Sequence, residues 1–355
     1  MHCNELKIAI ILGTSIGLGS ILLFIVGYWG YLTAIRWKLN QQKASNFKRN
    51  GGLLLKKRNS SEHGMTENNL LFTADELDKA TDHFNENRIL GRGGQGTVFK
   101  GMMTDGSLVA IKMHKLGDQT QLEEFINEIA ILSGINHRNI VRLLGCCLET
   151  DVPLLIYEFI VNGALSKYLH HPQNDYPITW HMRLQIALDV ASAIYHLHST
   201  SSSPIFHKDI KTDNILLDEK YRAKLSDFGT SRSISIDKSH LTTQVKGTFG
   251  YLDLEYHRTG QYNEKSDVFS FGVVIIELLT GKKAVYQTES GGRENLVLSF
   301  QEATENSAFQ DMLAPEVVNE ASVETIAAIT NLASQCLDPD RTLIISQFNS
   351  HVYYL

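Results

Sequence analysis

The chain has 355 residues, 43% of them hydrophobic, and a formal net charge of -6. It is therefore long enough to bury a full core and to hold about two domains. The 24 basic and 38 acidic residues after position 61 make the globular portion acidic, which argues against nucleic acid as a partner. The four scattered cysteines exclude a disulfide scaffold and a zinc site.

Residues 8–30 predict a single transmembrane helix. No charged residue lies between Lys7 and Arg36, and the apolar run is long enough to cross a bilayer core of ~30 Å. Aromatic residues that suit a membrane interface lie near its end, namely Tyr28, Trp29, Tyr31 and Trp37. A cleaved signal peptide is the alternative, but the run exceeds the usual core of ~7–15 residues and no small-x-small cleavage site follows. Residues 1–7 are then a short extracellular N-terminus.

The basic residues after this span predict its orientation. Eight of them, and no acidic residue, lie within residues 36–61: Arg36, Lys38, Lys43, Lys48, Arg49, Lys56, Lys57 and Arg58. Basic residues remain on the cytoplasmic side, so we expect a single-pass plasma membrane protein whose N-terminus is outside. The cluster is either a solvated linker or a site for anionic membrane lipid, worth about 1 kcal/mol per basic residue near the surface.

The surroundings of the span carry two weaker signals. Gly13 and Gly17 have a spacing found in helix dimers, which is compatible with self-association. In a span that contains several glycines the match is weak, and chance explains it better. Residues 40–69 are polar, contain Gly51-Gly52 and lack periodicity, which predicts a flexible juxtamembrane linker.

A short helix and a glycine-rich turn follow. Thr73 and Glu76 have the spacing of a capping box, which predicts a helix over 72–84. The glycine-rich stretch comprises Gly91, Arg92, Gly93, Gly94, Gln95 and Gly96. Glycines allow the backbone to approach a phosphate closely. The alternative, a dinucleotide fold, needs a helix directly after the turn, whereas Thr97-Val98-Phe99 continues as a strand.

The next elements alternate between strands and helices. Residues 108–112 predict a strand that ends on Lys112, which by itself is either solvated or functional. Residues 121–135 have helical periodicity and three candidate acidic residues, Glu123, Glu124 and Glu128. Further strands are predicted over 140–144 and 154–159, and a long packing helix over 180–198.

The stretch from His207 to Gly229 carries the strongest chemical signal. Asp209, Asn214 and Asp227 supply two carboxylates and an amide at spacings that suit phosphoryl transfer. That reaction needs one carboxylate to accept a hydroxyl proton and oxygen ligands to hold Mg²⁺ against a polyphosphate. Alone, Asp227-Phe228-Gly229 is more typical of an ordinary turn, but the two pieces together are specific.

A segment rich in Ser and Thr, residues 230–248, follows this stretch. Its composition is typical of a mobile segment that phosphate orders, and Thr242, Thr243 and Thr248 are the candidate phosphorylation sites. Residues 266–279 then predict a buried apolar helix.

From Phe84 to about Cys336 the chain resembles a eukaryotic protein kinase. Residues 124–128, 137–147 and 247–251 are similar to plant receptor-like kinases, and residues 51–55 and 226–232 to the wall-associated kinase group. The resemblance implies a two-lobed α+β protein kinase fold over 84–345. Its small lobe is expected over 84–158 and its large lobe over 159–345, with a linker and short helix over 31–83 and a tail over 346–355.

The resemblance also assigns roles, all for ATP-dependent phosphorylation of Ser or Thr in proteins, the chain itself included. Asp209 is the base, Lys112 pairs with Glu128, and Lys211 is typical of the serine/threonine class. Asn214 and Asp227 hold Mg²⁺, with Mn²⁺ as an alternative. The implied ATP contacts are Gly91, Arg92, Gly93, Gly94, Gln95, Gly96, Val98, Ala110, Lys112, Tyr157 as gatekeeper, and Glu158 and Phe159 as the hinge.

The chain departs from the family in three ways. The altered C-terminal ending supports a rival interpretation, a membrane scaffold that has the fold but little or no catalysis, whereas this interpretation is disfavoured by the presence of Lys112, Glu128, Asp209, Asn214 and Asp227. Lys208 stands where the family has Arg. The short N-terminus lacks the extracellular sugar-binding part of the family. The sequence from Asp338 to Thr342 departs from the usual ending, so we expect the last helix to be missing and the kinase portion to be less stable.

Overall fold

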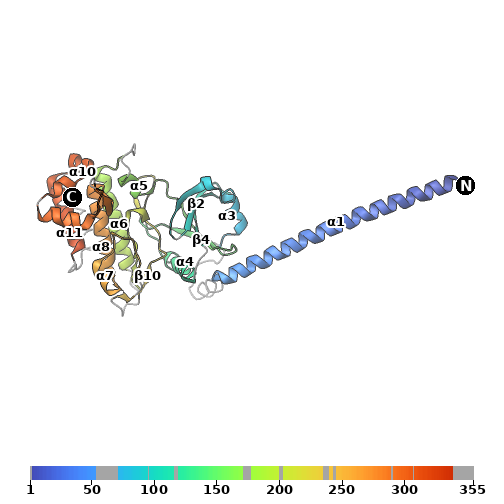
Figure 1. Ribbon diagram of the computed structural model, residues 1–355, viewed down its shortest axis with the longest axis horizontal. Coiled ribbons are helices and arrows are strands. Elements are labelled where there is room, and N and C mark those ends of the chain that lie inside the picture. The colour runs from blue at the N-terminus through green and yellow to red at the C-terminus, as the bar shows by residue number, and fades with distance from the viewer. Residues whose placement is uncertain are drawn as a thin grey trace.

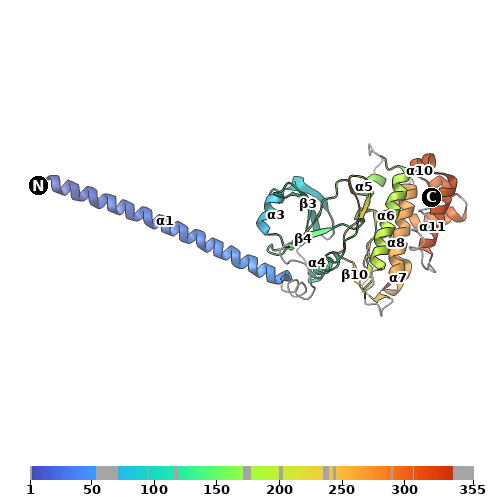
Figure 2. The same ribbon diagram turned by 180° about the vertical axis from the view of Figure 1, so that it is seen from behind.

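The computed structural model describes residues 2–52, 71–94, 96–115, 119–170, 177–199, 203–234, 240–242, 245–288, 291–306 and 308–338. A single long helix projects from a two-lobed body, and the described C-terminal helices lie at the opposite end of that body (Figure 1). The view from behind shows the same arrangement (Figure 2). The two-lobed α+β fold predicted from the sequence is confirmed.

The helix α1 runs from His2 to Arg49 without a break. At 1.5 Å per residue its length is about 72 Å, more than twice the ~30 Å core of a bilayer. One candidate membrane span, Gly19–Arg49, meets the criteria of length and composition among the described residues. Large apolar side chains such as Leu23, Phe24 and Trp29 are exposed there, which suits contact with lipid.

The predicted flexible linker over 40–69 is wrong in its first third. Residues 40–49 continue α1, and their side chains reach the small lobe. Charged and amide side chains in this stretch are compatible with a helix, and contacts with the lobe add to its stability. Residues 53–70 lie outside the described part of the chain.

The small lobe is a five-stranded antiparallel sheet in the order β1-β2-β3-β5-β4. Its strands are β1 Ile89–Arg92, β2 Gly96–Met102, β3 Leu108–His114, β4 Leu143–Cys147 and β5 Leu154–Glu158. Alternation along β3 directs Val109 and Ile111 into a core with Leu77 of α3 (Ala74–Ala80). The neighbouring residues Ala110 and Lys112 therefore face the opposite side of the sheet.

Two helical predictions in this lobe are confirmed with shorter bounds. Thr73 and Glu76 form the predicted capping box, and α3 begins at Ala74, directly after the N-cap Thr73. The 3-10 turn η2 spans Glu86–Arg88. The helix α4 spans Gln119–Leu132, whereas the sequence predicts 121–135; it ends earlier because Ser133 and Gly134 form a turn.

The strand predicted over 140–144 is wrong in its bounds. The backbone of residues 139–141 pairs with β9 (Ala223–Leu225) of the large lobe, where the Val141 N–H donates to the Leu225 carbonyl at 2.9 Å. The strand β4 begins only at Leu143. The segment of residues 139–141 and the strand β4 both need apolar side chains. The hydrophobic pattern therefore could not show that the first segment crosses between the lobes and that the strand begins after it.

The large lobe is mainly helical and is built around α8. The helices α6 Trp180–His198, α8 Glu264–Thr280 and α11 Val323–Leu337 pack together (Figure 1), and fifteen of the seventeen residues of α8 are buried. The other helices are α5 Ser166–Leu169, η3 Thr212–Asn214, α7 Leu254–Thr259, α9 Leu296–Glu305, η4 Phe309–Met312 and α10 Pro315–Glu320. The packing helix predicted over 180–198 is confirmed at both ends.

Short strands in the large lobe position the loops beneath the small lobe. They are β6 Gly163–Ala164, β7 Ile205–Phe206, β8 Ile215–Leu217, β9 Ala223–Leu225, β10 Arg232–Ser233, β11 Leu241–Thr242, β12 Gln261–Tyr262, β13 Val285–Gln287 and β14 Arg293–Asn295. In the sequence, the hairpin of β8 and β9 lies between the two halves of the stretch from His207 to Gly229. Because the two strands are antiparallel, the hairpin returns the chain, so that the two halves lie close together in space.

Candidate active site

A cleft of about 860 Å³ lies between the two lobes and collects the residues that the sequence singles out. Its lining includes the five predicted catalytic and metal-binding residues of the large lobe and α4: Glu128, Asp209, Lys211, Asn214 and Asp227. It also includes every predicted nucleotide contact among the described residues: Gly91, Arg92, Gly93, Gly94, Gly96, Val98, Ala110, Lys112, Tyr157, Glu158 and Phe159. Gln95, the remaining predicted contact, lies outside the described residues.

The glycine-rich turn joins β1 and β2 above this cleft, and its glycines have two different functions. No atom lies within 4 Å of the Cβ position of Gly91, Gly93 or Gly94, so the cleft side of the turn is open for a ligand. A Cβ on Gly96 would lie 2.1 Å from the Met113 carbonyl oxygen of β3. Gly96 is therefore required for strand pairing, which the sequence does not distinguish from phosphate binding.

Lys112 connects the small lobe to the large lobe. Its Nζ lies 3.0 Å from Oε2 of Glu128 on α4 and 2.8 Å from Oδ1 of Asp227. Burial lowers the pKa of Lys112, but the two carboxylates outweigh this effect and hold the pKa above its usual value. Of the three acidic residues of α4 that the sequence left as candidates, the structure brings Glu128 to Lys112.

The hydroxyl of Tyr157 is a second partner of Glu128, which sequence analysis missed. It donates to Oε1 of Glu128 at 2.6 Å, and the Phe228 N–H donates to the same oxygen at 3.3 Å. Glu128 is fully buried. Burial and the nearby Glu128 carboxylate raise the pKa of Tyr157 well above its usual value, so it is a neutral donor. No sequence signal distinguishes this role from that of a bulky apolar residue.

We predict that Tyr157→Phe lowers the free energy of unfolding by about 1–3 kcal/mol, because a buried carboxylate loses one of its donors. Denaturant unfolding of the full chain in detergent, followed by near-UV circular dichroism, measures the effect. Tyr195→Phe is the control, since that side chain is 45% exposed. Equal losses in the two variants would contradict the role of the hydroxyl.

Asp209 lies at the floor of the cleft within a network of short contacts. Oδ2 accepts from Lys211 Nζ at 2.7 Å and from Asn214 Nδ2 at 3.0 Å, and Oδ1 accepts from the Thr248 hydroxyl at 2.7 Å. Lys211 Nζ also donates to Thr248 Oγ1 at 2.8 Å. The Asp209 carboxylate is thus oriented by three side chains. The Thr248 hydroxyl lies where a group that donates a proton to this carboxylate would lie.

The loop that carries Asp209 is anchored by the buried Asp267 of α8. Its carboxylate accepts from the backbone N–H groups of His207 and Lys208, both at 2.9 Å, and from His198 Nε2 at 2.8 Å. These bonds hold Lys208 at φ 73°. Asp227 has φ 66°. Left-handed backbone is costly for residues other than Gly, and strained residues of this kind cluster at active sites and ligand contacts.

Lys208 is buried, and its Nζ lies 5.3 Å from the ring centroid of Tyr262 and 5.8 Å from that of Tyr256. Burial lowers the pKa of Lys208 to about 8, and Arg232 and Lys246 act in the same direction while Asp267 opposes them. In the family this position is Arg, and Lys differs because it can lose its charge near neutral pH.

We therefore predict that Lys208 makes folding stability rise with pH. An unfolded lysine has a pKa of ~10.4, so between pH 8 and ~10 the folded chain has released a proton that the unfolded chain still binds. Between pH 7.5 and 9.5 the free energy of unfolding of the native chain should gain on the order of 1–2 kcal/mol relative to Lys208→Met. The check is denaturant unfolding of both proteins at the two pH values; parallel pH profiles would contradict it.

The helix α4 is held by the segment after Asp227 as well as by Lys112. Oε1 of Glu124 pairs with Lys246 Nζ at 2.7 Å, and Asn127 Nδ2 donates to the Ser231 carbonyl at 2.6 Å. Both contacts come from residues 230–248, which the sequence predicts to be mobile. Where described, this segment therefore braces α4 in the position that brings Glu128 to Lys112.

The other predicted residues have mixed outcomes. The Glu158 carboxylate accepts from Lys224 Nζ at 2.9 Å and from the Arg142 N–H at 2.9 Å. Because this side chain already has partners, the backbone of Glu158 is the part that suits contact with a nucleotide. Of the candidate phosphorylation sites, Thr243 lies outside the described residues and Thr242 ends the short strand β11. Thr248 lies against Asp209, where an added phosphate would meet a carboxylate.

The residues present fit a divalent metal ion. Asn214 and Asp227 both line the cleft and provide amide and carboxylate oxygens, which are the ligands that Mg²⁺ prefers. Asn214 is oriented by donation of its Nδ2 to both the carbonyl and the carboxylate of Asp209, which leaves its amide oxygen available.

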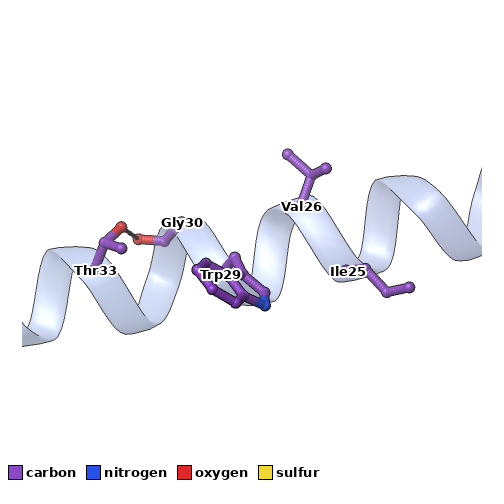
Figure 3. Close-up of a pocket in the computed structure, with 5 residues that line it drawn as sticks. All are labelled: Ile25, Val26, Trp29, Gly30 and Thr33. Carbon is purple, nitrogen blue, oxygen red and sulfur yellow. Dashed lines mark hydrogen bonds between the residues drawn. The ribbon is translucent and has the colours of Figure 1, made fainter.

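A second hollow lies on the surface of α1, far from this chemistry (Figure 3). It is lined by Ile25, Val26, Trp29, Gly30 and Thr33, and the Thr33 hydroxyl donates to the Gly30 carbonyl at 2.8 Å. Its lining carries no charged group, and it lies within the candidate membrane span. We therefore place the candidate active site in the cleft between the lobes.

Comparisons with known proteins give a consistent result. A family model described as protein tyrosine and serine/threonine kinase matches residues 84–342. Wall-associated receptor kinase-like 1 of Arabidopsis thaliana is 51% identical over 333 residues, which cover 94% of this chain and 46% of that protein. Wall-associated receptor kinase-like 6 of the same plant is 54% identical over 288 residues, 80% of this chain and 45% of that protein. The chain thus spans a little less than half the length of these curated relatives.

Proposed function

Because this chain belongs to the protein kinase family, we propose that it transfers the γ-phosphoryl group of ATP to Ser or Thr hydroxyls of proteins, including its own. The observation that carries the proposal is that one cleft brings together the linked groups Lys112, Glu128 and Asp227 with the pair Asp209 and Lys211. Four separated segments of the chain supply these groups in a geometry that suits phosphoryl transfer.

The proposed mechanism relies on positioning and electrostatics. The open glycines of the β1–β2 turn let backbone approach the phosphates, and Lys112, fixed by Glu128, neutralises their charge. Asp209 accepts the proton of the attacking hydroxyl, and Lys211 stabilises the charge that develops nearby. Asn214 and Asp227 would hold Mg²⁺ or Mn²⁺, which supplies further neutralisation of the polyphosphate.

The preference for Ser and Thr rests on the contact between Lys211, Asp209 and Thr248. The hydroxyl of Thr248 lies 2.7 Å from the carboxylate oxygen of Asp209 and 2.8 Å from Lys211 Nζ. An aliphatic hydroxyl of this chain thus occupies the position in which a substrate hydroxyl would meet the base. A Ser or Thr of a substrate would replace it with the same two contacts.

We also propose a receptor-type location, a single pass through the plasma membrane with the kinase portion in the cytoplasm. Support comes from the one candidate span among the described residues and from relatives named receptor kinases. Anionic lipid would bind the basic residues that directly follow the uncharged apolar run, such as Arg36 and Lys38. Lys43 and Arg49 contribute less to lipid binding, because they contact acidic residues of the small lobe.

An autophosphorylation assay on the full chain in detergent, with radiolabelled ATP and Mg²⁺, tests the proposal. Phosphoserine or phosphothreonine that appears with wild-type protein and is absent with Asp209→Asn supports it. Nucleotide binding without phosphate transfer would favour the rival, a scaffold with the kinase fold. Phosphotyrosine alone would retain the kinase and overturn the preference for Ser and Thr.

A further inference from the structure

The last turns of α1 and the two glycines after them are attached to the small lobe. In both views the end of α1 reaches the small lobe beside α4 (Figures 1 and 2). We call this segment the α1 clamp; its contact residues are Lys43, Asn46, Phe47, Arg49, Asn50 and Gly51. A helix longer than a membrane requires thus continues directly into a contact with the kinase fold.

Two buried asparagines form the centre of the α1 clamp. Asn46 and Asn50 are 5% and 3% exposed, and their spacing of four places them on one face of α1. Asn46 Nδ2 donates to the Glu149 carbonyl at 3.0 Å and to Asp151 Oδ1 at 3.1 Å. Asn50 Nδ2 donates to the carbonyls of Leu148 and Thr150 at 3.1 and 2.8 Å.

These hydrogen bonds are all directed at residues 148–151, the turn between β4 and β5. Asparagine is a poor helix former, and a buried amide without partners is costly. Asn46 lies in the last turn of α1 and is therefore unfavourable for the helix by itself, and Asn50, which directly follows the last helical residue Arg49, adds a second buried amide. They are favourable once the amides bind the carbonyl groups of the turn, which indicates that this face is built for docking.

Charge complementarity surrounds the asparagines. Lys43 Nζ lies 3.3 Å from the carboxylate of Asp75 and 3.6 Å from that of Glu149. Arg49 donates to the Asp151 carbonyl at 2.6 Å. The basic end of α1 thus meets an acidic patch of the small lobe, so the same residues that indicate membrane orientation also hold the lobe.

The α1 clamp also contacts α4, the helix that carries Glu128. Gly51 ends the helical segment with a left-handed φ of 83°, and a Cβ there would lie 2.9 Å from Cδ1 of Ile126. Phe47 packs against the same core cluster as Phe125. Ile126 and Glu128 are two residues apart on α4, so displacement of one moves the other.

We propose that the α1 clamp couples the membrane helix to the active site by holding α4 in the position where Glu128 pairs with Lys112. The consequence for catalysis rests on the proposed kinase function, whereas the coupling itself does not. A force on the membrane helix that detaches the α1 clamp would remove one of the contacts that hold α4, whereas its described contacts with Lys112, Lys246 and Ser231 would remain.

The test is hydrogen–deuterium exchange on the full chain in lipid nanodiscs. In the double variant Asn46→Leu/Asn50→Leu, amides of α4 and of residues 148–151 should exchange at least tenfold faster than in wild type, and phosphoryl transfer should fall at least fivefold. Asn40→Leu, an exposed position on the same helix, is the matched control and should change neither. Unchanged exchange in α4 would overturn the proposal, even if residues 148–151 exchange faster.

A charge exchange tests the same contact without removing a buried side chain. Lys43→Glu and Asp75→Lys should each accelerate exchange in α4, and the double variant should exchange more slowly than Lys43→Glu alone, because the pair between positions 43 and 75 is re-formed with opposite signs while Glu149 still faces position 43. Exchange that is as fast in the double variant as in Lys43→Glu would count against the proposal. If hydrogen–deuterium exchange in α4 responds to these variants but the chain transfers no phosphate, the coupling through the α1 clamp is supported and the kinase function is rejected.

Discussion

Replacing Asp209 by Asn should lower the rate of phosphoryl transfer by a factor of ~10²–10⁴, which is the usual contribution of a general base. The variant should fold normally. The amide oxygen of Asn can still accept from Lys211 and Asn214, which share one carboxylate oxygen, and its NH₂ group can donate to the Thr248 hydroxyl. The substitution therefore removes the proton acceptor and little else.

The initial rate of phosphate incorporation by the full chain in detergent measures this effect. Thermal unfolding followed by near-UV circular dichroism should show melting temperatures within a few degrees of each other. Asp311→Asn, an exposed carboxylate in η4, is the matched control and should retain the wild-type rate. An Asp209→Asn chain that keeps more than a tenth of the rate would remove Asp209 from the role of base.

Replacing Lys112 by Met should remove both activity and stability. The cation holds Glu128 and Asp227 together, and loss of electrostatic stabilisation of the transferred group lowers the rate by ~10²–10³. Glu128 is fully buried and would keep only its neutral donors, Tyr157 and the Phe228 N–H. Breaking a buried ion pair from one side typically costs about 3–5 kcal/mol, so the free energy of unfolding should fall by a similar amount.

The two effects of Lys112→Met are separated by measuring them independently. Phosphoryl transfer is assayed at a temperature where circular dichroism shows the variant to be folded, and stability is obtained from denaturant unfolding. Lys220→Met, at an exposed lysine, is the control for both. A variant with wild-type stability but no activity would mean that the ion pair is weak in the folded chain; full activity would contradict the role of Lys112.

Some features were determined by the sequence alone because neighbouring residues encode them. Thr73 and Glu76 predict a capping box that depends only on residues three apart. The helix over 180–198 is predicted at both ends because its apolar periodicity is long, and in the structure Thr179 caps it. The catalytic stretch was found because Asp209, Asn214 and Asp227 lie within one short segment of chain.

Other features were decided only by the tertiary structure. The hydroxyl of Tyr157 reaches Glu128, and that of Thr248 reaches Asp209, across 29 and 39 residues of sequence. Asn46 and Asn50 bind a turn about 100 residues away, where the sequence suggested a flexible linker. The physical reason is that helix propensity, capping and periodicity act between neighbours. The partner of a buried polar group is instead chosen by which elements pack together, since any suitable donor or acceptor within reach can satisfy it.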